Sequence, residues 1–239
     1  MSLLVNTTYR SNKEEIMDDL NYHGPVLHDA LDKLAKINRW LGGNQVTMNG
    51  LKILLKNHPK ELPVTIVDVG CGSGDILREI AKYGKRHGYQ FQLLGIDANP
   101  YTVAYAKRQS EAFDTITFET IDVFSEDFNA LQYDVVLATL FLHHFDKEAL
   151  IYLLSPVVKK AKIGVVINDL HRHKLAYYLF KLLCITIKNR TIIEDGLTSV
   201  LRGFKRKELE EISQNLDADF QIKWKWAFRF QWILKPKNI

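Results

Sequence analysis

The sequence predicts an α/β fold built on a doubly wound, mainly parallel sheet, with a helical extension at its N-terminus. Apolar runs of strand length alternate with segments of helix length, an order typical of βαβ units in a parallel sheet. The expected strands are residues 64–70, 91–97, 115–121, 133–139 and 162–169. The expected helices between them are residues 75–87, 100–113 and 146–161.

The N-terminal extension is predicted to be helical because residues 13–57 lack strand-like alternation. Gly24-Pro25 and Gly42-Gly43 divide it into short helices. The expected domains are a helical cap at 1–60 and a main domain at 61–239, with a helical insertion at 171–204.

Near the C-terminus, apolar side chains recur at every second position, which predicts a β-ribbon with one aromatic face. They are Phe220, Ile222, Trp224, Trp226, Phe228, Phe230 and Trp232. The basic residues between them could instead indicate a surface on which nucleic-acid bases stack. We favour strands packed beneath a helix, because a half-buried sheet requires one wholly apolar face.

Composition is that of an ordinary globular protein, with 46% hydrophobic and 25% charged residues. The net charge of +4 is spread along the chain, without the basic arm that would indicate nucleic-acid binding. Cys71 and Cys184 offer neither a disulfide framework nor a paired zinc motif. No apolar stretch approaches ~18 residues. We expect a cytoplasmic protein with no metal ion and no stable membrane insertion.

The segment VDVGCGSGD, residues 67–75, places three glycines at alternate positions directly after a strand. Such a turn lets the backbone approach a ligand at the N-terminus of the next helix. The dinucleotide fingerprint needs glycine or alanine where this chain has Asp75, and a carboxylate there repels a pyrophosphate. Asp97, after the second strand, is placed to accept hydrogen bonds from ribose hydroxyls. Asp122, after the third, suits an exocyclic amino group.

Four segments together carry a resemblance to a known family. VDVGCGSGD, GIDANP, IDVF and YDVVLATLFLHHF, in this order and spacing, resemble class I S-adenosylmethionine-dependent methyltransferases over roughly residues 60–235. The resemblance implies a Rossmann-like sheet of seven strands, mostly parallel with an antiparallel final strand, and S-adenosylmethionine as cofactor. The cofactor contacts that it implies are Asp68, Gly70, Cys71, Gly72, Gly74, Asp97, Ala98, Asp122, Val123 and Thr139.

Histidines are the expected catalytic residues. Methyl transfer from a sulfonium mainly requires alignment of the acceptor, and a base helps when the acceptor is a hydroxyl. Histidine suits that role near neutral pH. Four histidines follow the fourth and fifth strands: His143, His144, His171 and His173. We expect His144 or His171 to be the base, although a single loop histidine is more often a cap or a solvated side chain.

Other polar residues have expected supporting roles. Asn168 and Asp169 would orient a histidine, and Arg172 would bind an acidic group. The carboxylate of the cofactor would lie near residues of the cap, the candidates being Tyr9, Arg10 and Arg39. ATLFLHH departs from the [DN]PP[YF] sequence of enzymes that methylate adenine amino groups in nucleic acid, so we expect no nucleic-acid partner.

The resulting hypothesis is O-methylation of a small, apolar or phenolic acceptor. A C-methyltransferase of a quinone-like ring and a catalytically silent cofactor-binding subunit stay open, whereas Asp75 disfavours a nicotinamide oxidoreductase. The apolar segment at 175–187 would roof the acceptor pocket, form a homodimer contact, or lie on a membrane surface. Its anchors in the last case would be Lys174, Lys181, Lys188 and Arg190.

Overall fold

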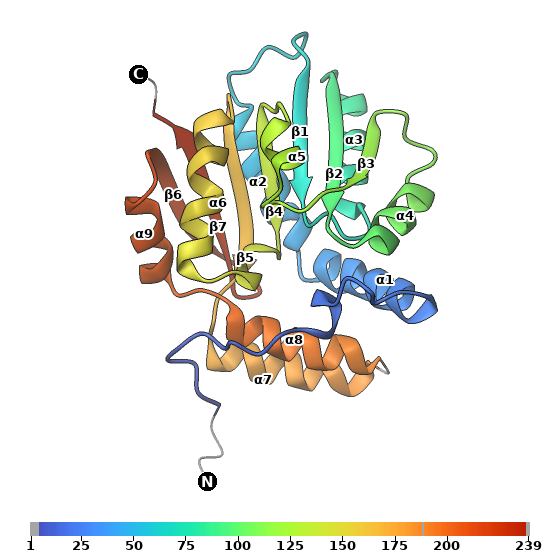
Figure 1. Cartoon of the computed structure of the whole chain (residues 1–239), viewed down its shortest axis with the longest axis vertical. Helices are drawn as coiled ribbons and strands as arrows, with labels where there is room; N and C mark the ends of the chain where they lie inside the picture. The colour runs from blue at the N-terminus through green and yellow to red at the C-terminus, as the bar shows by residue number, and fades with distance from the viewer. Residues whose placement is uncertain (1–4, 188, 238–239) are drawn as a thin grey trace.

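A computed structural model describes residues 5–187 and 189–237, so Lys188 lies outside the described residues. Seven strands form one sheet in the order β3-β2-β1-β4-β5-β7-β6 (Figure 1). They are β1 (Val64–Val69), β2 (Phe91–Asp97), β3 (Ile116–Thr120), β4 (Val135–Thr139), β5 (Gly164–Leu170), β6 (Ala218–Lys225) and β7 (Arg229–Pro236). Only β7 runs antiparallel to the other strands. The predicted fold class is confirmed.

Helices cover both faces of this sheet. One face carries α2 (Gly43–Leu54), α3 (Asp75–His87) and α4 (Pro100–Gln109). The other carries α5 (Glu126–Ala130), α6 (Lys147–Lys160) and α9 (Arg206–Gln214). Continuously apolar strands such as β1 are therefore buried from both sides, as their sequences predict.

A third group of helices lies beyond the carboxyl edge of the strands. It comprises α1 (Pro25–Trp40), α7 (Lys174–Leu183) and α8 (Arg190–Arg202) (Figure 1). Three short 3-10 helices complete the chain: η1 (Ile16–Asp18), η2 (Leu142–His144) and η3 (Cys184–Thr186). None of the helices in the described residues combines the length and the apolar character needed to cross a bilayer.

The N-terminal extension contributes to both parts of the structure. α1 lies at the carboxyl edge, whereas α2 packs on β5 and β7. Met48 and Leu51 of α2 belong to the same buried cluster as Ile66 of β1. Residues 43–54 therefore form part of the layer that covers the sheet, and the domain boundary at residue 60 stays a prediction.

The β6–β7 hairpin has the aromatic face that its alternation predicts. Trp224 pairs with Phe230 and Ile222 with Trp232, which places all four on one side. Ile222, Phe230 and Trp232 share a buried cluster with side chains of α6 and α9. Trp224 is half exposed because β6 is the edge strand of the sheet. The buried part of this face packs beneath helices, as we favour from the sequence, whereas Trp226 and Phe228 lie in the turn between the strands.

Gly50 lets α2 lie close to the sheet. An ideal Cβ at this position would come 2.4 Å from Cγ1 of Val166. Gly50→Ala should gain about 1 kcal/mol of helix propensity but lose about 1–3 kcal/mol through overpacking. We therefore expect a lower free energy of unfolding in urea. Asn49→Ala, at an exposed neighbouring position, is the control and should not destabilise the protein. A Gly50→Ala protein as stable as wild type would contradict this tight packing.

Candidate active site

A cavity of ≈ 1520 Å³ lies at the carboxyl edge of the sheet, against the α1, α7 and α8 group. Small-molecule pockets usually measure about 300–1,000 Å³, so this one has room for more than one ligand. The structure brings every predicted cofactor-binding residue except Gly74 into its wall. Their contacts with a cofactor stay predictions.

The glycine turn is explained both by backbone conformation and by its neighbours. Gly70, Gly72 and Gly74 have φ values of 65°, 52° and 73°, in the left-handed region that favours glycine. A Cβ at Gly70 would come 2.3 Å from the Phe141 ring, and one at Gly74 would come 2.6 Å from the Phe118 ring. At Gly72 the nearest atom would be 3.8 Å away. Gly72 is thus the glycine of this turn that leaves open space beside the backbone.

Three carboxylates stand at the ends of neighbouring strands, as predicted. Asp68 is only 2% exposed and its Oδ1 has no hydrogen-bond partner among the described residues. Burial and the nearby carboxylates of Asp75 and Asp97 raise the pKa of Asp68 well above its usual range. A bound ammonium group, directly or through water, would satisfy this orphaned oxygen.

Asp97 is held in place by two backbone groups. Its Oδ1 accepts a hydrogen bond from Asn99 N at 3.0 Å, and its Oδ2 accepts one from Gly72 N at 3.3 Å. Burial raises the pKa of Asp97, although these two N–H donors partly offset the effect. Asp122 is more exposed, and its Oδ1 accepts from Phe124 N at 2.9 Å. The carboxylate of Asp97 is therefore the more rigidly placed of the two.

Residues 66–163 match a family model described as a methyltransferase domain. These residues form a methyltransferase domain. S-adenosylmethionine is the methyl donor of such a domain, and the orphaned Asp68 oxygen, the open turn at Gly72 and the fixed carboxylate of Asp97 fit that cofactor. No protein of curated function matches the sequence.

Solved methyltransferase structures share the fold at low sequence identity. The plantazolicin methyltransferase BpumL in complex with SAH is 17% identical, with a TM-score of 0.63 over 87% of this chain and 89% of that chain. The magnesium protoporphyrin IX methyltransferase (ChlM) from Synechocystis PCC 6803 with bound SAM is 14% identical, with a TM-score of 0.55 over 92% and 89%. The CMeT domain of the citrinin polyketide synthase is 12% identical, with a TM-score of 0.60 over 82% and 53%.

His143 of the methyltransferase is enclosed by two carboxylates. Its Nδ1 lies 2.7 Å from Asp169 Oδ1, and its Nε2 lies 3.6 Å from Glu15 Oε1. Burial by itself would lower the pKa of His143, but Asp169 and Glu15 outweigh burial and raise the pKa to about 9. His143 is therefore protonated at neutral pH and has no free nitrogen to accept a proton. The predicted orienting role of Asp169 is consistent with this contact.

This ion-pair cluster makes stability depend on pH. The pKa of His143 is about 9 in the folded protein and about 6.5 in an unfolded chain. Protonated His143 therefore stabilises the folded protein by on the order of 1–3 kcal/mol. This stabilisation is fully present below about pH 6.5 and is lost as pH rises through about 9. We expect the difference in free energy of unfolding between wild type and His143→Gln to shrink between about pH 6 and pH 10. A difference that is constant across this range would contradict the cluster.

His144 has one nitrogen held and one free. Its Nδ1 lies at an ion-pair distance of 2.7 Å from Asp18 Oδ1 without hydrogen-bond alignment, and Arg202 Nη1 donates to Asp18 Oδ2 at 2.8 Å. Burial of Asp18 would raise its pKa, but His144 and Arg202 lower the pKa well below its usual range. The His144 side chain is 22% exposed and lines the cavity. Its Nε2 has no hydrogen-bond partner within the described part of the chain.

His171, the other predicted base, is placed to donate rather than to accept a proton. The indole N–H of Trp224 donates to His171 Nδ1 at 3.3 Å. Burial, followed by the charges of His173 and Arg172, lowers the pKa of His171 to about 4. The ring is therefore neutral with its proton on Nε2, because Trp can only donate. His173 caps α7 by accepting from Leu175 N. The geometry therefore favours His144 over His171 and His173 as the base.

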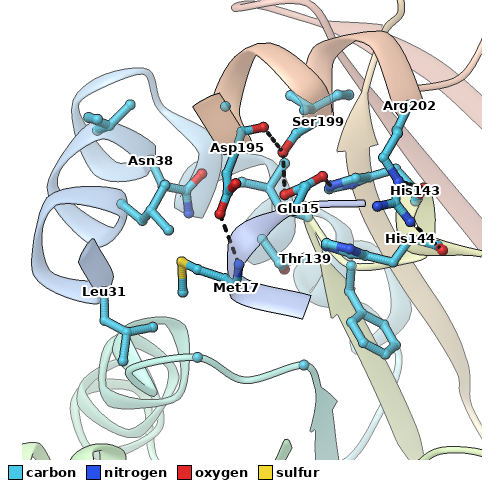
Figure 2. Close-up of a pocket in the computed structure, with 18 of the residues that line it drawn as sticks. Glu15, Met17, Leu31, Asn38, Thr139, His143, His144, Asp195, Ser199 and Arg202 are labelled. Carbon is cyan, nitrogen blue, oxygen red and sulfur yellow. Dashed lines mark hydrogen bonds and ion pairs between the residues drawn. The ribbon is translucent and has the colours of Figure 1, made fainter. Parts of the chain in front are cut away.

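Two of the acids that face these histidines, Glu15 and Asp18, are not predicted from the sequence. Asp18 is the last residue of η1 and Glu15 directly precedes this helix, whose first N–H groups donate to the carboxylate of Asp195. Figure 2 shows Glu15 between Ser199 of α8 and His143. The acidic segment EEIMDDL is the signal in the sequence, but its contacts join residues more than 120 positions apart.

The same cluster has the residue types of a metal site. Ligand atoms of Glu15, His143 and His144 lie within 4.8 Å of one another. Glu15 Oε1, His143 Nε2 and His144 Nδ1 have no hydrogen-bond partner among the described residues, and Asp169 faces His143 Nδ1 as the orienting acid of a metal-binding histidine does.

The residues predicted to bind an anionic group contact other protein groups or are exposed to solvent. Arg172 is buried and donates to Thr7 O, Gly203 O and Glu208, which corrects its predicted role in binding an acidic ligand. The Arg10 guanidinium donates to three backbone carbonyls, Tyr9 is 80% exposed, and Arg39 faces Glu79. Two other arginines, Arg202 and Arg229, do line the cavity, and neither is predicted as a site residue from the sequence.

Proposed function

We propose that this methyltransferase transfers a methyl group to the hydroxyl of a small apolar or phenolic molecule, with His144 as the base. The observation that carries the proposal is the His144–Asp18 contact of 2.7 Å in the cavity wall, which leaves Nε2 for an acceptor. A base oriented in this way from its second nitrogen is a recurrent catalytic arrangement.

Each residue of the site has one role in the proposed methyl transfer. S-adenosylmethionine, when bound, supplies a methyl group already activated on a sulfonium. His144 Nε2 accepts the proton that the acceptor hydroxyl loses. The carboxylate of Asp18 stabilises the imidazolium that forms, and Arg202 keeps that carboxylate in position. Asp97 and the turn at Gly72 hold the donor, so that the two substrates meet in a fixed geometry.

The wall of the cavity supports an apolar or aromatic acceptor. Side chains from α1, α7, α8, the loop after β4 and the β6–β7 turn all contribute apolar surface. They include Leu34, Ile37, Phe141, Phe145, Leu179, Phe180, Val200 and Trp226. α7 therefore lines the cavity, which supports the predicted roof over the acceptor rather than a dimer or membrane contact.

Two alternatives follow from the same site. The CurJ carbon methyltransferase has a similar fold, with a TM-score of 0.58 at 12% identity, so methylation of a ring carbon is the second candidate. A silent cofactor-binding subunit is the third, but the free Nε2 of His144 beside an ion-paired acid argues for chemistry.

Transfer of a ¹³C-labelled methyl group to a panel of phenols and quinols, followed by NMR of the product, distinguishes these candidates. The proposal expects the labelled carbon bonded to oxygen. A label bonded to a ring carbon would support C-methylation. Tight binding of S-adenosylhomocysteine without any transfer would support the silent subunit.

A further inference from the structure

Arg229, the first residue of β7, is a buried cation without an ionic partner. It is 3% exposed, lines the cavity, and its Nε and Nη1 have no hydrogen-bond partner among the described residues. Asp169 is close enough to influence its pKa, but Asp169 contacts His143, and no ion pair joins Arg229 to any described carboxylate. Successive side chains on β7 point to opposite faces of the sheet, so Arg229 lies on the same face as Gln231, which is the face that α2 covers.

An unpaired buried charge of this kind is costly. Several kcal/mol per ion is the usual effective penalty for removing a charge from water without a partner. Burial lowers the pKa of Arg229 to about 10, although Asp169 opposes the effect, so the guanidinium is still charged at neutral pH. A cation retained at this cost in the wall of a cavity indicates an anionic ligand.

The start of α2 lies beside Arg229, and its dipole adds positive potential there, although no residue of α2 lines the cavity. An ideal Cβ on Gly43 would come 2.9 Å from Arg229 Cζ, so the guanidinium lies against the first residue of the helix. The first N–H groups of a helix lack intrahelical partners and favour anions. The amide oxygen of Asn38, also beside Gly43 and without a partner, could accept one N–H but carries no charge.

We propose that Arg229 forms a subsite that binds a carboxylate in the active-site cavity. β7 is separated from β1 by β4 and β5, on the side away from Asp97 and Asp122. The carboxylate therefore belongs either to the methyl acceptor or to the methionine tail of the cofactor. Its assignment to the acceptor rests on the proposed function, whereas the subsite itself does not.

Calorimetry with Arg229→Gln tests the subsite and identifies its ligand. If the cofactor supplies the carboxylate, the affinity for S-adenosylhomocysteine should fall at least about tenfold. The affinity for 5′-methylthioadenosine, which has no carboxylate, should not change. If the acceptor supplies it, S-adenosylhomocysteine should bind as in wild type, and benzoate binding to the saturated enzyme should be lost while benzamide is unaffected. Arg229→Lys should retain part of either affinity because it keeps the charge.

Two further measurements separate binding from a structural role. Arg206→Gln, which removes an exposed arginine paired with Glu210 and outside the cavity wall, is the control and should behave as wild type. The Tm of unliganded Arg229→Gln should be unchanged or higher, because the variant removes an unpaired charge. The subsite is refuted if Arg229→Gln binds S-adenosylhomocysteine as wild type does and no benzoate affinity depends on Arg229. Wild-type protein that fails to bind S-adenosylhomocysteine would instead refute the cofactor assignment.

Discussion

Replacing His144 with Gln should lower kcat by about 10²–10⁴-fold, the usual contribution of a general base. The amide keeps the size and polarity of the side chain but cannot take the proton of the acceptor. The affinity for S-adenosylhomocysteine should stay within about twofold, because the base acts on the acceptor. Asp18→Asn should lower kcat less, since the imidazole is retained without its stabilising charge.

His171→Gln is the matched control for this prediction. It replaces another histidine of the same cavity, one whose Nδ1 already accepts from Trp224. A His144→Gln enzyme with wild-type kcat would exclude His144 as the base. A larger loss in His171→Gln than in His144→Gln would transfer the role to the end of β5.

Replacing Asp97 with Ala should weaken S-adenosylhomocysteine binding by about 1–3 kcal/mol, the cost of leaving ribose hydroxyls without their acceptor. The loss should be large because two backbone N–H groups hold this carboxylate in a fixed position. Asp122→Ala should cost less, since that carboxylate is exposed to water.

Glu119→Ala is the charge-matched control for these measurements. Glu119 is an exposed acid on β3 outside the cavity wall, so its removal changes the charge by the same amount without touching the site. Calorimetric affinities that are equal for Asp97→Ala and Glu119→Ala would remove Asp97 from the cofactor site.

The strands are predictable because burial on both faces leaves a continuous apolar run. All five predicted parallel strands are present, with ends that differ by at most two residues. α5 is missed because five residues give too little periodicity. α2 begins at Gly43 rather than after it, because Gly42 adopts a left-handed conformation and Gly43 packs against Asn38 and Arg229. Glycines that start a helix are easily mistaken for a break.

The site is predictable where topology fixes it. Asp97 and Asp122 follow strands whose carboxyl ends must meet at one edge, so their sequence positions determine their place. Asp18 and His144 are 126 positions apart, and no local pattern predicts that they meet. Arg172 and Arg229 could not be distinguished by sequence either, since the difference lies in Glu208, which pairs with the first and not with the second.

A crystal structure of the protein with S-adenosylhomocysteine tests the cofactor site most directly. We expect the ligand to lie over Gly72 with both ribose hydroxyls within hydrogen-bond distance of the Asp97 carboxylate. Crystals that hold the compound elsewhere, or that leave this turn bare at saturating concentration, would contradict the assignment.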